Sequence, residues 1–279
     1  MYSKRFSMEE ISPKLPKTIN EAHVDAYIQE SVQEIGDGLD TRHPAVLVIP
    51  GGGYFFTSNR EADPVAMKFM AEGFTTFILR YSCAPDRYPT QLLQAAATIA
   101  FMRTNAAEYH IDPDRIFVLG FSAGGHLTAS AGILWKEPVI KEVLGIDNEL
   151  CRPTGMVPCY PVITSGEFAH RGSFENLLGP DATQEMLDYV SLEKRVDADT
   201  VPAFLWHTFA DGGVPVENSL LLANALRKHN VPFELHIYPE GVHGLSVCSE
   251  LSAKPGQDQL INPHNATWVP LCIEWMKLF

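Results

Sequence analysis

Residues 117–125 read Phe-Val-Leu-Gly-Phe-Ser-Ala-Gly-Gly, an apolar run that leads into a G-x-S-x-G pattern. A short, continuously apolar run is typical of a buried parallel strand, and the small residues that follow are typical of the start of a helix. In such a unit Ser122 stands on a sharp turn that exposes its hydroxyl at the end of a sheet. Gly120 and Gly124 let the two arms of the turn pass closely, because neither carries a Cβ atom. The stretch predicts an α/β fold with a nucleophilic serine.

Outward from this unit, apolar runs alternate with helical patterns along the chain. This alternation predicts a mostly parallel central sheet with helices on both faces, within a single α/β domain over residues 1–279. We expect strands at 45–50, 75–81, 116–121, 155–163, 203–209 and 233–239, and helices at 62–73, 90–109, 216–229 and 268–279. A weaker alternation over His23–Ser31 predicts an antiparallel edge strand. Ser58 and Glu61, three residues apart, predict a capping box at the start of the first of these helices.

Thr164–Thr200 does not fit the alternation, because it places 37 residues between two strands with only fragments of helical pattern. A long excursion in a compact domain is usually a binding loop or a lid. We therefore expect this segment to cover the site as a short cap.

A nucleophilic serine needs a base, and the base needs a carboxylate that orients it. His243 lies in a glycine-flanked loop directly after the last predicted strand, and Asp211 directly follows the strand at 203–209. Ser122, Asp211 and His243 thus each follow the C-terminal end of a different strand. This chain order is that of the α/β-hydrolases. We predict these three residues as the catalytic triad.

Other histidines and acids are less well placed for these roles. They lie within strands or helices, in a Pro/Asn-rich loop, or before a strand instead of after it: His207, His236, His126, His264, Asp197 and Asp199.

A third element is the run Pro50-Gly51-Gly52-Gly53-Tyr54, again at the end of a predicted buried strand. Glycines there allow backbone N–H groups to approach an acyl oxygen. The amides of Gly52 and Gly53, with that of Ala123, are the predicted oxyanion hole. A phosphate-binding loop is the alternative interpretation, but G-x-G-x-x-G is not completed and no lysine follows.

With these motifs, the sequence resembles the esterase/lipase branch of the α/β-hydrolases, and in particular bacterial acetyl-xylan and feruloyl esterase-like proteins. The matching stretches are Pro50–Tyr54, Arg60–Ala62, Gly120–Leu127, Asp211–Ser219 and Gly241–Leu245. Pro50 stands where hormone-sensitive-lipase-like enzymes carry the histidine of H-G-G-G, which speaks against that subfamily. The stretch after Leu245, through Pro263, matches no motif.

The predicted triad and oxyanion hole indicate a serine carboxylester hydrolase, whose chemistry requires no metal or other cofactor. The resemblance implies that its substrates are small acyl esters of sugars or related alcohols. Aromatic residues beside the oxyanion hole and in the excursion are candidates for the pocket wall or, equally, for the core: Tyr54, Phe55, Phe168 and Phe174. Three alternatives stay open, namely an aryl formamidase, a serine peptidase of the same fold and a non-catalytic binding protein.

Composition narrows the possible partners. The net charge of −13 argues against nucleic acid, whose phosphates require clustered Lys and Arg. The five cysteines have no C-x-x-C spacing, so we expect neither a disulfide framework nor a zinc site. No apolar run is long enough to predict a membrane span, and no signal-peptide pattern opens the chain. We expect a cytoplasmic protein with a small-molecule ester as its partner, although a processed secreted form would look the same.

Overall fold

The computed structural model describes residues 1–30 and 42–279. Within them, eight strands form one sheet in the order β1-β2-β4-β3-β5-β6-β7-β8. The strands are β1 (Tyr2–Ser7), β2 (His23–Ile28), β3 (His43–Ile49), β4 (Thr75–Arg80), β5 (Ile111–Phe121), β6 (Gly155–Cys159), β7 (Ala203–Thr208) and β8 (Phe233–Tyr238). The pairs from β4 through β8 are all parallel, which confirms the predicted sheet.

The expected edge strand over His23–Ser31 is antiparallel, but it is not the edge. Strand β2 pairs with β4 on one side and with β1 on the other, and β1 forms the border of the sheet. Only Phe6 of β1 is buried, so this strand carries little of the hydrophobic alternation by which a strand is recognised. Ser31 lies outside the described residues.

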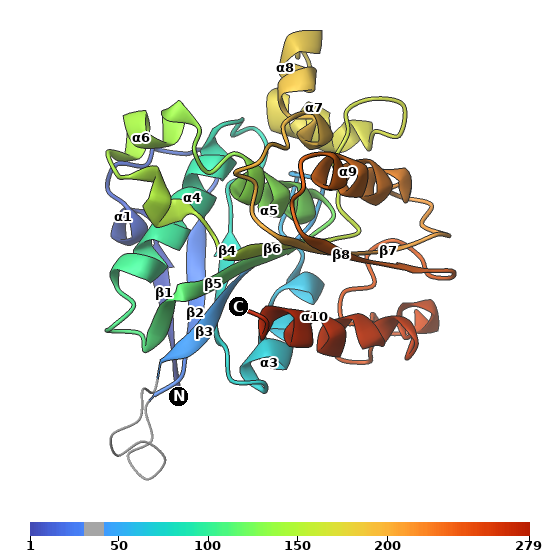
Figure 1. The fold of residues 1–279 in the computed structure, drawn as a ribbon, viewed down its shortest axis with the longest axis horizontal. Helices are drawn as coiled ribbons and strands as arrows, with labels where there is room; N and C mark the ends of the chain where they lie inside the picture. Colours follow the sequence, from blue (N-terminus) through green and yellow to red (C-terminus); the bar gives the residue numbers. More distant parts are fainter. Residues whose placement is uncertain (31–41) are drawn as a thin grey trace.

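Helices cover both faces of the sheet (Figure 1). Helices α4, α5 and α9 lie on one face, and α3 and α10 lie on the other. The helices are α1 (Met8–Ile11), α3 (Asp63–Met70), α4 (Thr90–Thr104), α5 (Ala123–Ile133), α6 (Pro138–Leu144), α7 (Arg171–Leu178), α8 (Gln184–Tyr189), α9 (Glu217–Lys228) and α10 (Trp268–Met276). The four helices expected at 62–73, 90–109, 216–229 and 268–279 are present as α3, α4, α9 and α10, and each is shorter than its expected range.

The apolar side chains of the sheet divide into two cores, one on each face. Leu47 and Leu205 belong to the core under α4, α5 and α9. Val48 and Trp206 belong to the core under α3 and α10, where Trp206 stacks on Trp268 with a ring separation of 5.2 Å. Burial on both faces holds the parallel strands in register, so the loops at their C-terminal ends meet along one edge of the sheet.

The excursion over Thr164–Thr200 contains α7, α8 and a short 3-10 helix at Leu192–Lys194. In Figure 1, α7 and α8 stand beyond α5 and α9, on the same side of the sheet. None of the helices in the described residues is both long enough and apolar enough to span a membrane.

Candidate active site

Ser122 occupies the turn between β5 and α5, with φ 54° and ψ −118°. A positive φ is strained for a residue with a side chain, and it lifts the hydroxyl away from the sheet. The turn is possible because glycines stand two residues before and two residues after Ser122. A Cβ at Gly120 would lie 2.4 Å from the carbonyl oxygen of Gly124, and a Cβ at Gly124 would lie 2.2 Å from that of Ile49.

His243 lies between Ser122 and Asp211. Its Nε2 is 2.8 Å from the hydroxyl oxygen of Ser122, and its Nδ1 is 2.7 Å from Oδ2 of Asp211. With a proton on Nδ1, the imidazole donates to the carboxylate and accepts from the serine hydroxyl. The loops after β5, β7 and β8 thus bring these three groups, separated by up to 121 residues of sequence, into one hydrogen-bonded chain.

The Asp211 side chain is only 1% exposed, yet it is held in its charged form. Burial by itself would raise the pKa of this carboxyl, but hydrogen bonds from His207, His243 and the Val214 amide outweigh that effect and lower the pKa. Oδ1 accepts from the N–H groups of Gly213 and Val214 at 2.8 and 2.9 Å. The competing acids Asp197 and Asp199 instead contact Lys136.

His207 is a second histidine beside Asp211, and its role was missed from the sequence. Its side chain is fully buried, and Nε2 lies 3.0 Å from the Val214 carbonyl oxygen and 3.3 Å from Oδ2 of Asp211. Nδ1 pairs with the Ser219 hydroxyl at 2.8 Å, which fits a proton on Nε2. The four-residue spacing between His207 and Asp211 was the available signal.

The glycine run after β3 has the geometry of an oxyanion-binding loop. Gly52 and Gly53 have φ angles of 131° and 64°. A Cβ at Gly52 would lie 2.0 Å from the Phe56 carbonyl oxygen, so a side chain is excluded there. Within the described residues, neither the Gly52 nor the Gly53 N–H donates a hydrogen bond. Ala123 is the first residue of α5, where an N–H has no partner inside the helix.

The predicted capping box between Ser58 and Glu61 does not form. Ser58 makes no side-chain hydrogen bond to the following turn, a short 3-10 helix at Asn59–Glu61, and α3 begins only at Asp63. The Glu61 side chain turns inward instead, where it accepts from the Gly51 N–H at 3.0 Å and from the Tyr160 hydroxyl at 2.6 Å. These two buried donors displaced the local pairing that the sequence pattern suggested.

The same turn also reaches the loop that carries His243. The Arg60 guanidinium donates to the carbonyl oxygens of Gly244 and Ser252, and the Ser246 hydroxyl donates to the Arg60 carbonyl oxygen. Residues 60 and 61 therefore tie the glycine run and the histidine loop together.

An open groove surrounds Ser122 and His243. Its wall includes Gly52, Gly53, Phe56, His170 and Lys254.

The four aromatic residues expected in the pocket wall are absent from this lining. Tyr54 is buried, with its hydroxyl 2.8 Å from Nδ1 of His126, and Phe174 packs edge-on against the same imidazole. Phe55 is 70% exposed, and Phe168 is half-buried beside α9. Tyr54 and Phe174 thus pack against His126 and do not line the groove around Ser122.

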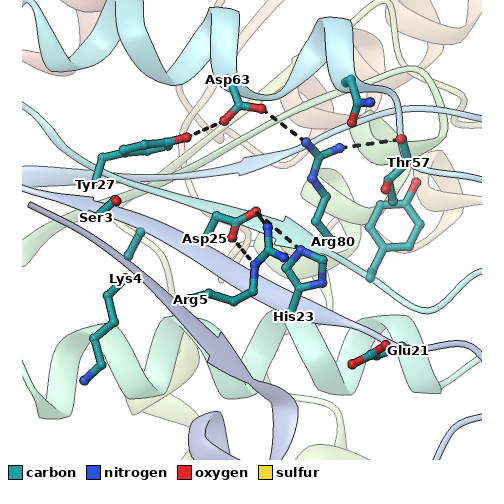
Figure 2. Close-up of a pocket in the computed structure, with 13 residues that line it drawn as sticks. Ser3, Lys4, Arg5, Glu21, His23, Asp25, Tyr27, Thr57, Asp63 and Arg80 are labelled. Atoms are coloured by element: carbon teal, nitrogen blue, oxygen red, sulfur yellow. Dashed lines mark hydrogen bonds and ion pairs between the residues drawn. The ribbon is translucent and has the colours of Figure 1, made fainter.

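A second, larger hollow lies on the face of β1, β2 and β4 (Figure 2). Four of its charged groups are paired with one another, Arg5 with Asp25 and Arg80 with Asp63. Tyr27 donates its hydroxyl proton to Asp63 in the same network. Within the described residues, no group of three or more metal-ligating side chains is positioned to hold an ion, here or elsewhere.

Comparison with known proteins gives one family and several relatives. Residues 37–226 match the family model BD-FAE. The chain is 38% identical over 220 residues to endo-1,4-beta-xylanase B of Butyrivibrio fibrisolvens, a match that covers 76% of this chain and 34% of that protein. The chain likewise spans less than two thirds of the length of the other curated relatives that it matches.

Solved structures match over nearly the whole chain. An acetyl ester-xyloside bifunctional hydrolase from Caldicellulosiruptor lactoaceticus is 36% identical, with a TM-score of 0.83, covering 98% of this chain and 95% of that one. A carboxylesterase from Lactobacillus plantarum is 28% identical, with a TM-score of 0.84, covering 99% and 97%.

Proposed function

The chain belongs to the BD-FAE family, and from this membership and its site we propose that it is a serine carboxylester hydrolase. The observation that carries the proposal is the hydrogen-bonded chain from Ser122 through His243 to Asp211, which faces the donor-rich glycine run. We further propose that the substrates are small acyl esters of sugars or related alcohols. A xylanase and an acetyl ester-xyloside hydrolase among the similar proteins support this substrate class.

In the proposed acylation step, Nε2 of His243 removes the proton from Ser122 while the serine oxygen attacks the ester carbonyl carbon. The carbonyl oxygen becomes an oxyanion that accepts hydrogen bonds from the amides of Gly52, Gly53 and Ala123. As this intermediate collapses, the imidazolium gives its proton to the departing alcohol oxygen. The products of this step are a free alcohol and an acyl-serine.

Deacylation repeats the sequence with water as the nucleophile. His243 removes a proton from water, whose oxygen attacks the acyl carbon. The proton then returns to Ser122 as the carboxylic acid leaves.

Asp211 has an electrostatic role in both steps. Its carboxylate fixes the imidazole tautomer and stabilises the imidazolium that forms twice in each cycle. The hydrogen bonds from His207, Gly213 and Val214 hold the carboxylate in place and charged.

We also propose that the segment Thr164–Thr200 acts as a short cap that selects the alcohol. Asn176 of α7 donates a 2.9 Å hydrogen bond to the Gly53 carbonyl oxygen, and His170 lines the groove. Nε2 of His126 donates to the Val190 carbonyl oxygen, so the cap is also anchored to α5. These contacts favour a cap over an insertion remote from the site.

A substrate panel tests the proposal. We expect the purified protein to hydrolyse p-nitrophenyl acetate faster than longer-chain esters, and to release acetate from acetylated xylo-oligosaccharides. Ser122→Ala serves as the control for uncatalysed hydrolysis. Faster turnover of N-formyl aryl amides or of peptides than of any ester would replace the ester-hydrolase assignment.

A further inference from the structure

His170 is a second imidazole in the catalytic groove. It lies on the excursion immediately before α7, is half-buried, and lines the same hollow as Ser122 and His243. The triad does not use it, and none of the sequence motifs points to it.

The ring of His170 is oriented by a buried serine. Nδ1 lies 2.8 Å from the Ser173 hydroxyl oxygen, and Ser173 is only 1% exposed. Ser173 in turn lies beside the oxyanion loop, because a Cβ at Gly53 would lie 3.9 Å from its hydroxyl oxygen. One edge of the imidazole therefore faces the protein. Nε2, at the opposite edge, is accessible and has no hydrogen-bond partner among the described residues.

A neutral His170 fits a groove in which His243 becomes an imidazolium cation during the proposed reaction. Burial, followed by the neighbouring charge of His243, lowers the pKa of His170. A neutral imidazole does not repel the His243 imidazolium, and it keeps one ring nitrogen available for a neutral polar group.

We propose that Nε2 of His170 hydrogen-bonds a hydroxyl group on the alcohol part of the substrate, adjacent to the ester oxygen. The inference rests on the proposed ester hydrolysis and specifies the alcohol. The leaving oxygen must lie against His243, which protonates it, and His170 lines the same groove as His243. In the proposed complex, a hydroxyl on the neighbouring ring carbon of a sugar points along this groove toward Nε2 of His170. The preferred substrates are esters of vicinal diols, such as partly acylated pyranosides, over esters of simple alcohols.

Two matched substrates test this inference. One is a mono-acetylated methyl xyloside with a free hydroxyl next to the ester, and the other is its deoxy analogue without that hydroxyl. We expect His170→Ala to lower kcat/KM for the first substrate by about tenfold, the effect of one lost hydrogen bond in a site, and to change the deoxy analogue by less than twofold. His170→Gln, whose amide offers both a donor and an acceptor, should recover part of the loss.

Two measurements accompany the kinetics. Thermal unfolding of each variant shows whether the fold is kept. Ser173→Ala, which removes the hydrogen bond that orients the His170 ring, should lower kcat/KM less than His170→Ala does, with the same dependence on the substrate. An equal loss on both xylosides, or no loss on either, overturns the inference while leaving ester hydrolysis intact. If the wild-type protein hydrolyses neither xyloside nor p-nitrophenyl acetate, the proposed function itself fails, and this inference with it.

Discussion

The Tyr160 hydroxyl donates a 2.6 Å hydrogen bond to Glu61, which lies 99 residues earlier in the chain. The same carboxylate accepts from the Gly51 N–H, and the same hydroxyl oxygen accepts from the Ser246 N–H. The Tyr160 ring also packs edge-on against the His243 imidazole, with a ring separation of 5.2 Å. Burial, and then the charge of Glu61, raises the pKa of Tyr160 well above its usual value, so the phenol remains a donor. Glu61 and Tyr160 together therefore connect the glycine run to the loop that carries His243.

Tyr160→Phe should lower kcat by roughly tenfold with KM changed less than twofold. A hydrogen bond to a charged group contributes about 1.5–3 kcal/mol, and part of that loss should appear as misplacement of the oxyanion loop in the transition state. The measurement is steady-state kinetics on p-nitrophenyl acetate. Tyr27→Phe is the matched control, because that hydroxyl also bonds a carboxylate, Asp63 (Figure 2), but neither of these two residues lines the groove around Ser122. Equal losses in both variants would contradict a specific role for Tyr160.

Ser122→Ala should reduce turnover by about 10⁶ and Asp211→Asn by about 10⁴, as in other serine triads. Because the members of a catalytic triad act as a unit, the proposed roles predict that the double variant is little slower than Ser122→Ala alone. Rates are best compared at saturating substrate with the spontaneous hydrolysis subtracted. Additive losses in the double variant would mean that Asp211 acts apart from Ser122.

Asn176→Ala removes the hydrogen bond between α7 and Gly53, so it loosens the proposed cap at its contact with the site. We expect the ratios of kcat/KM between esters of different alcohols to change by about fivefold, which corresponds to roughly 1 kcal/mol. The kcat/KM for p-nitrophenyl acetate should stay nearly unchanged. Asn148→Ala is the control, since Asn148 likewise donates to a carbonyl oxygen, that of Glu137. A uniform slowing of every ester would count against selection of the alcohol by the cap.

His126 predicts how stability depends on pH. Burial lowers the pKa of this histidine to about 4, and the neutral ring accepts from Tyr54 and donates to Val190. Between pH 6.5 and 4 the unfolded chain binds a proton that the folded chain does not, so the free energy of unfolding falls as the pH is lowered through this range. The loss amounts to about 3 kcal/mol and is complete only below pH 4, once the folded histidine is also protonated.

Urea unfolding at a series of pH values measures this effect. His126→Gln should be less stable than the wild type at pH 7 but should show a shallower decline toward pH 4. His264→Gln, at an exposed position, should keep the wild-type slope. Parallel curves for His126→Gln and the wild type would refute the assignment.

The parts of the site that follow from local pattern could be predicted from sequence. Ser122 is identified by the glycines that its own turn requires, and Asp211 and His243 by their position directly after buried strands. The parallel order of the sheet then brings these loop residues to one edge, as the 2.7 and 2.8 Å contacts show.

The supporting residues could not be found in the same way, because their partners are distant in sequence. Glu61 has the spacing of a capping box, but its partners are the Gly51 amide and a tyrosine on the far side of β5. The ring of His170 is held in the groove by a hydrogen bond with Ser173, whose hydroxyl lies beside Gly53. Competition among buried donors and acceptors decides such contacts, and hydrophobic periodicity carries no information about it.

The positive φ of Ser122 makes a mutation that removes this serine energetically easier than a mutation that restores it. A φ of 54° is unfavourable for serine by about 1–3 kcal/mol and nearly free for glycine. In a lineage no longer selected for the proposed ester hydrolysis, Ser122→Gly would remove the proposed nucleophile and relieve the backbone strain in a single substitution. Regaining serine would reverse that stabilisation, so evolutionary drift at this position runs toward an inert, more stable descendant.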